Sequence, residues 1–124
     1  MAGLLVLIAA ISGFLAVALG AFGAHALRRR LSSENIAIFQ TGVQYQMYHS
    51  LAILAVALIR YWATPSTWMT YAAWCFVLGI ILFSGSLYLL STTGKKAFGP
   101  ITPIGGLAFL AGWVFLAIGS TKVV

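Results

Sequence analysis

Residues 3–26 decide the fold, and they read Gly-Leu-Leu-Val-Leu-Ile-Ala-Ala-Ile-Ser-Gly-Phe-Leu-Ala-Val-Ala-Leu-Gly-Ala-Phe-Gly-Ala-His-Ala. This stretch holds no charged side chain, and the basic run Arg28-Arg29-Arg30 comes just after it. A helix of this length rises about 36 Å, enough to cross a hydrocarbon core about 30 Å thick. A secretory signal would begin with its basic residues. We therefore expect an uncleaved transmembrane helix here.

The composition of the whole chain supports a membrane protein. Of 124 residues, 62% are hydrophobic and only 6% are charged, whereas charged residues make up about a quarter of a soluble domain. This composition excludes an ordinary soluble enzyme and a disordered chain. Since one span needs about 20 residues, the length allows four spans and no second domain. We expect residues 1–124 to form a single transmembrane domain.

Three further apolar stretches predict the other spans, at about 34–59, 68–90 and 102–120. Backbone polar groups in lipid must be bonded internally, which leaves helices or a closed barrel, and the alternation of a barrel strand is absent. The predicted fold is all-α, an integral membrane four-helix bundle with short loops. Local signals mark the helix ends: Ser32 or Ser33, Pro65, Thr92-Thr93-Gly94, Pro100 and Pro103.

The basic residues predict how the chain is oriented. Arg28-Arg29-Arg30 and Lys95-Lys96 lie in the loops after the first and third spans, on one side of the membrane. The other side has Arg60 and Lys122. By the positive-inside rule the side with five charges is cytoplasmic, and both termini face outward. The net charge of +6 is then an orientation signal, and we expect no nucleic-acid partner.

Rows of small residues indicate close helix packing. In the first span Ser12, Ala16, Gly20 and Ala24 recur every four residues, and in the fourth Gly105, Gly112 and Gly119 recur every seven. Such rows let helix backbones approach each other in lipid. We favour packing within one chain, while a homo-oligomer interface would use the same chemistry.

Polar residues of the spans gather toward the side of the Arg28 loop. On a helix with 100° per residue, one face of the second span carries Thr41, Gln44, Tyr45 and Tyr48, with His49 at its edge, while Gln46 and Ser50 point elsewhere. The candidate polar pocket consists of His25, Thr41, Gln44, Tyr45, Tyr48, His49, Ser84 and Ser86. Two interpretations stay open: hydrogen bonds between helices, or a pocket for a lipid headgroup, a small amphiphile or water.

Other chemistry is weakly supported by the sequence. His25, His49 and Glu34 are at most three zinc ligands, whereas structural zinc usually takes four. Haem ligation by two histidines requires equal heights, which we do not expect. We predict no metal, no cofactor and no catalytic residues. Arg28, Arg29 and Arg30 form a candidate site for anionic lipid headgroups.

Four motifs resemble one known family. They are residues 20–25 (Gly-Ala-Phe-Gly-Ala-His), 41–49 (Thr-Gly-Val-Gln-Tyr-Gln-Met-Tyr-His), 82–88 (Leu-Phe-Ser-Gly-Ser-Leu-Tyr) and 101–106 (Ile-Thr-Pro-Ile-Gly-Gly). Together they are similar to the small four-span membrane family catalogued as domain of unknown function four-two-three. The resemblance implies a bacterial inner-membrane protein with four helices, and it implies no activity.

Three functional hypotheses follow. The first is a non-enzymatic inner-membrane protein that binds lipid or a partner protein through a polar end near His25 and His49. The second is a small-molecule binder or transporter that uses an intramembrane polar cavity around His25, Gln44, Tyr48 and His49. Transport would favour an oligomer, because one such bundle has little room for a pore. The third, which the sequence supports least, is an enzyme or a haem or redox subunit.

Overall fold

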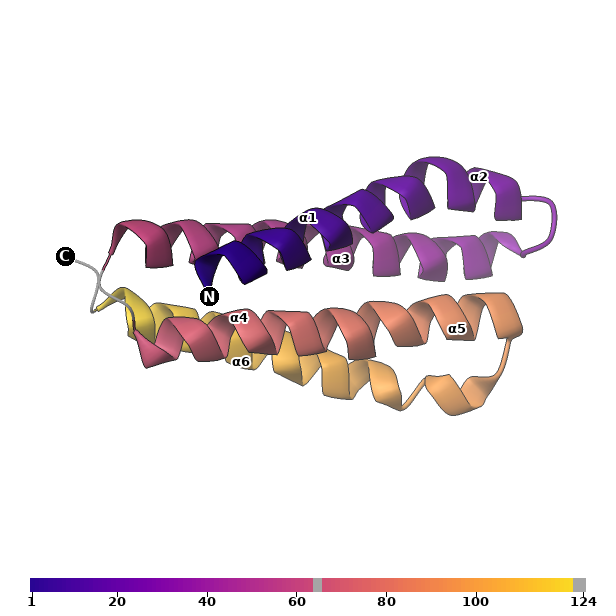
Figure 1. Ribbon diagram of the computed structural model, residues 1–124. Helices are drawn as coiled ribbons and strands as arrows, with labels where there is room; N and C mark the ends of the chain where they lie inside the picture. Colours follow the sequence, from indigo (N-terminus) through magenta and orange to yellow (C-terminus); the bar gives the residue numbers. More distant parts are fainter. Residues whose placement is uncertain (64–65, 122–124) are drawn as a thin grey trace.

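The computed structural model describes residues 1–63 and 66–121, which are helical apart from short turns (Figure 1). Four helical segments are long and apolar enough to cross a membrane: Ala2–Leu27, Ser33–Trp62, Thr67–Thr93 and Lys96–Ser120. The predicted all-α membrane fold is confirmed. Pro65 and Lys122, which entered the sequence argument as a helix start and as a charge, lie outside the described residues.

Two of the four segments contain a π-helical turn. The first segment consists of α1 (Ala2–Ala18), the π turn η1 (Leu19–Gly23) and α2 (Ala24–Leu27), and the second is the single helix α3 (Ser33–Trp62). The third consists of α4 (Thr67–Gly79), the π turn η2 (Ile80–Ser84) and α5 (Gly85–Thr93). A 3-10 turn, η3 (Lys96–Phe98), precedes α6 (Ile101–Ser120). Such π turns are rare and frequently lie at functional sites, and the hydrophobic pattern gives no sign of them.

Local capping determines where helices begin and end. The Ser32 hydroxyl accepts a hydrogen bond from the backbone N–H of Asn35 at 3.1 Å and so caps the start of α3. Gly94, with φ of 70°, ends α5 in the left-handed conformation, and its N–H donates to the Leu90 carbonyl. Glycine adopts this conformation at no steric cost.

The spans pack as two antiparallel pairs that meet along α3. α1 packs against α3, α4 packs against α6, and α3 also contacts α4 and α5 (Figure 1). The start of α1 and the last turn of α6 lie at one end of the molecule, and the loops after α2 and α5 lie at the other (Figure 1). The buried cluster between the pairs includes Ile53, Val56 and Phe76.

Two backbones approach each other closely where α6 crosses η2. A Cβ placed on Gly105 would lie 2.3 Å from the backbone nitrogen of Phe83. No side chain fits at that distance, so glycine is what allows the contact. The small residues of the fourth span therefore serve packing within the chain.

Candidate functional site

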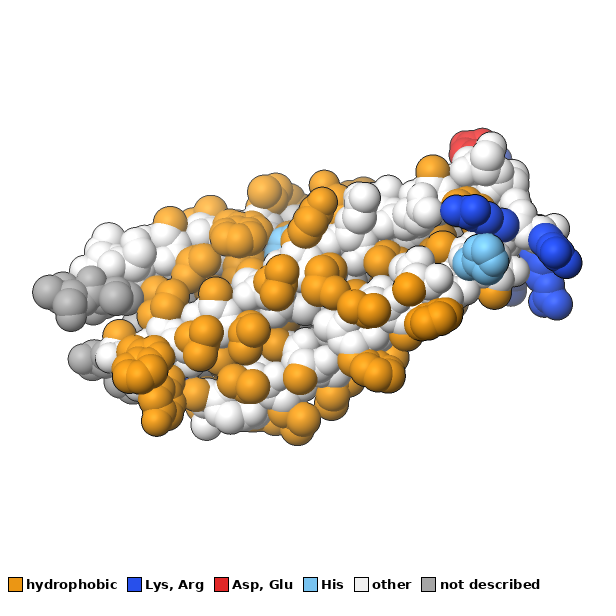
Figure 2. Space-filling view, turned by 90° about the horizontal axis from the view of Figure 1, so that it is seen from above, with side chains coloured by type: hydrophobic (Ala, Val, Ile, Leu, Met, Phe, Trp, Pro, Cys, Tyr) orange, Lys and Arg blue, Asp and Glu red, His pale blue; other side chains and the backbone are white. Residues whose placement is uncertain are grey.

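Two loops place five basic side chains at one end of the molecule. Arg28, Arg29 and Arg30 follow α2, Lys95 and Lys96 follow α5, and all five are exposed. In Figure 2, Lys and Arg side chains gather at one end, beyond the hydrophobic surface that covers most of this face. This basic end carries its charge where the chain leaves the apolar spans, which is the level of lipid headgroups.

The opposite end carries Arg60, which the protein itself engages. One terminal guanidinium nitrogen of Arg60 donates to the carbonyl of Ser66 at 3.4 Å and to the hydroxyl of Thr70. The side chain is half-buried. Among residues 1–63 and 66–121, one end therefore carries five exposed cations and the other a half-buried arginine that is hydrogen-bonded by the protein.

The two histidines do not share a site. Ser12 contacts Gln46 and Ser50, and these contacts fix the height of α1 relative to α3. His25 lies thirteen residues beyond Ser12, which is about 20 Å along the helix axis, and it is exposed at the basic end. His49 lies at the level of Ser12, in the middle of the membrane. The predicted polar end therefore contains His25 but not His49.

His49 is buried, with 4% of its surface exposed, and both of its ring nitrogens are bonded. Nδ1 lies 2.8 Å from the Tyr45 carbonyl, and Nε2 lies 3.1 Å from the indole nitrogen of Trp113. Because indole only donates, Nε2 accepts and Nδ1 carries the proton. The imidazole stacks on Phe109, with ring centres 3.6 Å apart and planes 9° apart. His49 is a neutral histidine that joins α3 to α6.

A polar network that the sequence did not predict joins three spans. Gln46, 5% exposed, donates from Nε2 to the Ser12 carbonyl at 2.8 Å, and its Oε1 accepts from the Tyr88 hydroxyl at 2.6 Å. The Ser50 hydroxyl lies 2.6 Å from both the Gln46 carbonyl and the Ser12 hydroxyl. Gly42 leaves room for the Tyr88 ring, since a Cβ there would lie 2.8 Å from that ring.

Ser84 and Ser86, both predicted for the polar pocket, are buried and make local or interhelical bonds. The Ser84 hydroxyl donates to the Gly42 carbonyl of α3 at 2.7 Å. The Ser86 hydroxyl donates to the Phe83 carbonyl at 2.8 Å and lies 2.5 Å from the hydroxyl of Thr102 in α6. These bonds support the interpretation of interhelical hydrogen bonding for both serines.

The structure does not bring the pocket candidates on one face of the second span together. Gln44 is exposed, Tyr48 is 55% exposed, and the hydroxyl of Thr41 donates to the Ala37 carbonyl of its own helix at 3.0 Å. The polar residues on the buried side are instead Gln46, His49 and Ser50. Lipid is as apolar as a protein core, so hydrophobicity alone does not tell the inner face of a spanning helix from the outer.

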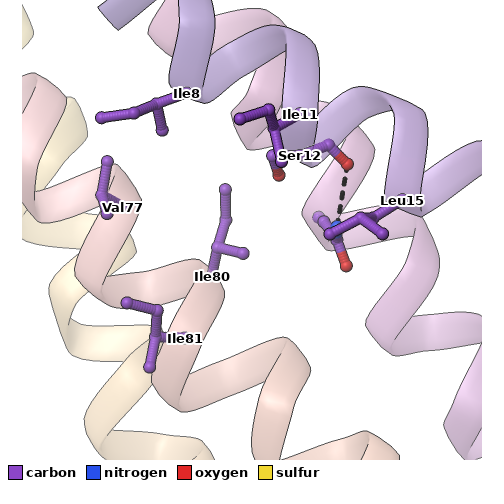
Figure 3. A pocket seen from close by; sticks show the side chains of 8 residues that line it. Ile8, Ile11, Ser12, Leu15, Val77, Ile80 and Ile81 are labelled. Carbon is purple, nitrogen blue, oxygen red and sulfur yellow. Dashed lines mark hydrogen bonds between the residues drawn. The ribbon is translucent and has the colours of Figure 1, made fainter. Parts of the chain in front are cut away.

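Two grooves open from the spans toward lipid. One, of about 280 Å³, lies between α1 and the third span; isoleucines line it, and Ser12 and Gln46 border it (Figure 3). The other, of about 520 Å³, lies between α3 and α6 and is bordered by Tyr45, His49 and Trp113. In the part of the chain that the structure describes, no three His, Cys, Asp or Glu side chains form a metal-binding group.

Comparison with known proteins gives consistent matches. Residues 19–106 match the model of a family described as "Protein of unknown function (DUF423)". The UPF0382 membrane protein YwdK of Bacillus subtilis is 42% identical over 94% of this chain and 95% of its own length. The UPF0382 inner membrane protein YgdD of Escherichia coli K12 is 41% identical over 96% of this chain and 90% of its own length. No solved structure matches the chain.

Proposed function

We propose that this chain, which belongs to the DUF423 family of membrane proteins, binds anionic lipid headgroups. The family assigns no activity, and the proposed role is non-enzymatic. The binding surface is the basic end, formed by residues 28–30 and 95–96. The proposed location is the bacterial inner membrane, because the Escherichia coli relative is named an inner membrane protein.

One observation carries the proposal: two loops far apart in the sequence bring five exposed cations to one end. Each basic residue next to a membrane attracts anionic lipid by about 1 kcal/mol, so cations from both loops together give a stronger preference than either loop alone. His25 lies at the same end and adds a polar side chain near the headgroups.

The same charges support an orientation. The positive-inside rule assigns the basic end to the cytoplasm and both termini to the outside. At the other end, Arg60 is engaged by Ser66 and Thr70. The basic end would thus face the anionic leaflet that it is proposed to bind.

The test is native mass spectrometry of the protein released from nanodiscs containing equal parts phosphatidylglycerol and phosphatidylethanolamine. We expect phosphatidylglycerol to be retained preferentially. The preference should fall in R28Q/R29Q/R30Q, fall less in K95Q/K96Q, and rise in Glu34→Gln, which removes the only acidic side chain of the chain from the same end. Equal retention of the two lipids by the wild type would contradict the proposal.

A second candidate function is the binding of a small amphiphile within the membrane. The observation that favours it is the groove of about 520 Å³ between α3 and α6, a volume in the range of small-molecule sites. Of the residues proposed for a polar pocket, Tyr45 and His49 border this groove. Transport of such a molecule would need an oligomer.

Self-association is a separate proposal about partners. The extensive contact of α1 with another span is the one with α3. A Cβ at Gly13 on α1 would meet no atom within 4 Å. A second copy packed on this open face would bury it. Crosslinking between cysteines introduced at position 13 of two copies would support the proposal, and monomers in nanodiscs at all protein-to-lipid ratios would contradict it.

A further inference from the structure

The groove between α3 and α6 is walled by flat rings. Tyr45 and Phe83 have ring centres 4.7 Å apart, Phe83 and Phe109 lie 5.4 Å apart, and Phe109 stacks on His49. The indole of Trp113 also lines the groove, and its N–H is bonded to His49. Such a wall gives a planar ligand stacking contacts with a defined orientation. A flexible acyl chain would gain contact there but no orientation.

The groove also offers a hydrogen-bond donor that the protein leaves unused. The hydroxyl of Tyr45 makes no hydrogen bond to any residue in the ranges 1–63 and 66–121, although its side chain borders the groove and is 37% exposed. Tyr45 lies twelve residues after Ser33, so about 18 Å inside the span, where water does not supply a partner. A hydroxyl without a partner in an apolar medium costs several kcal/mol. The site therefore favours a ligand that accepts a hydrogen bond.

The α6 side of the groove is open at Gly106. A Cβ there would meet only the ring of Phe83, at 3.9 Å, which is ordinary van der Waals contact. The neighbouring Gly105 instead faces the backbone of Phe83 at 2.3 Å. A larger side chain at position 106 would thus fill the groove without separating the helices.

From these features we propose that the groove binds the ring of a lipid-soluble quinone. A quinone ring is flat, its carbonyl oxygens accept hydrogen bonds, and its isoprenoid tail is compatible with the lipid outside. The Tyr45 hydroxyl donates to one carbonyl, and the ring lies against Phe83 and Trp113, whose side chains are partly exposed, while buried Phe109 and His49 support them from behind. The inference rests on the second candidate function and names its ligand class; it concerns binding and includes no electron transfer.

The test is titration of the purified, detergent-solubilised protein with decylubiquinone, followed by tryptophan fluorescence. Quinones quench indole on contact, and all proteins compared carry Trp62→Phe, Trp68→Phe and Trp74→Phe, so that Trp113 is the remaining tryptophan and reports on the groove. We expect saturable quenching of the wild type and of Gly3→Leu, a matched control whose added side chain lies in open space on α1. Tyr45→Phe should bind about fivefold more weakly, the loss expected for one hydrogen bond. Gly106→Leu should bind at least tenfold more weakly and keep its helical circular dichroism.

The outcomes distinguish failure of the quinone proposal from failure of the candidate function, which is amphiphile binding in the groove. Quenching that rises without saturation, or that is equal in the wild type and Gly106→Leu, would reflect partition into the micelle and would overturn the quinone proposal. A phospholipid with brominated acyl chains provides the second arm. If it quenches Trp113 and Gly106→Leu relieves that quenching, while decylubiquinone does not bind, the groove takes an acyl chain and only the ligand class is wrong. If neither probe binds, the candidate function falls as well.

Discussion

The indole N–H of Trp113 in α6 donates a hydrogen bond to Nε2 of His49 in α3 across 3.1 Å. This bond requires Nε2 to be unprotonated, and the other ring nitrogen, Nδ1, then donates to the Tyr45 carbonyl at 2.8 Å. One interhelical contact therefore selects a neutral tautomer of His49 and ties the second span to the fourth in the middle of the membrane.

Replacing Trp113 by phenylalanine tests this contact. Trp113→Phe keeps an aromatic ring and removes the donor, so the Nε2 atom of His49 loses its partner. We expect a loss of about 1 kcal/mol in the free energy of unfolding, measured by reversible unfolding in mixed micelles of sodium dodecyl sulfate. Trp74→Phe, at a partly exposed position away from His49, is the control. ¹⁵N spectra showing a protonated Nε2 in the wild type would contradict the assignment.

The contact between Gly42 and Tyr88 gives a second prediction. Gly42→Ala would push the Tyr88 ring, now 2.8 Å from the added Cβ, and break the bond from its hydroxyl to Gln46. We expect a loss of about 1–3 kcal/mol from this overpacking, against about 0.6 kcal/mol for Tyr88→Phe, which removes only the hydrogen bond. The two variants should be strongly non-additive when combined with Gln46→Leu. Additive losses in the same unfolding assay would show that the three residues are not coupled.

Much of the fold could be predicted from the sequence because its signals are local. The length and composition of each apolar run predict a spanning helix, and Ser32 and Gly94 mark helix ends through bonds to residues three or four positions away. Hydrophobicity and the absence of mid-span charges settle the class without knowledge of tertiary contacts.

The candidate site was harder to predict, because it depends on which side of α3 faces inward. Tyr48 and Gln46 are both polar and two positions apart, yet Tyr48 is exposed and Gln46 is buried. Gln46 is inside because Ser12 and Tyr88 supply partners from other spans, and no local pattern shows such partners. Small residues carry part of this information, since both Gly42 and Gly105 lie where helices meet.

Two adjacent glycines of α6 give a matched pair of predictions. In Gly105→Ala the new Cβ would lie 2.3 Å from the Phe83 backbone, so α6 must move away from η2. We expect a loss of about 1–3 kcal/mol or more in stability, as for other overpacked sites. In Gly106→Ala the Cβ faces the groove, and the change should stay within about 0.5 kcal/mol. Thermal unfolding in a mild detergent measures both, and equal losses would contradict the crossing of α6 over η2.

The basic end leads to a prediction about topology. The five cations at residues 28–30 and 95–96 outnumber Arg60 and Lys122, so the positive-inside rule predicts a cytoplasmic location for both basic loops. Alkaline phosphatase fused after residue 31 should be inactive, and the enzyme fused upstream of Met1 with its own export signal removed should be active. Replacing all five cations by glutamine leaves the other side as the more basic, and the two reporters should exchange activities in at least part of the population. Arg60→Gln strengthens the asymmetry and should leave the wild-type pattern unchanged. If the fivefold variant keeps that pattern, these charges do not orient the chain, and the case for a cytoplasmic basic end loses its support.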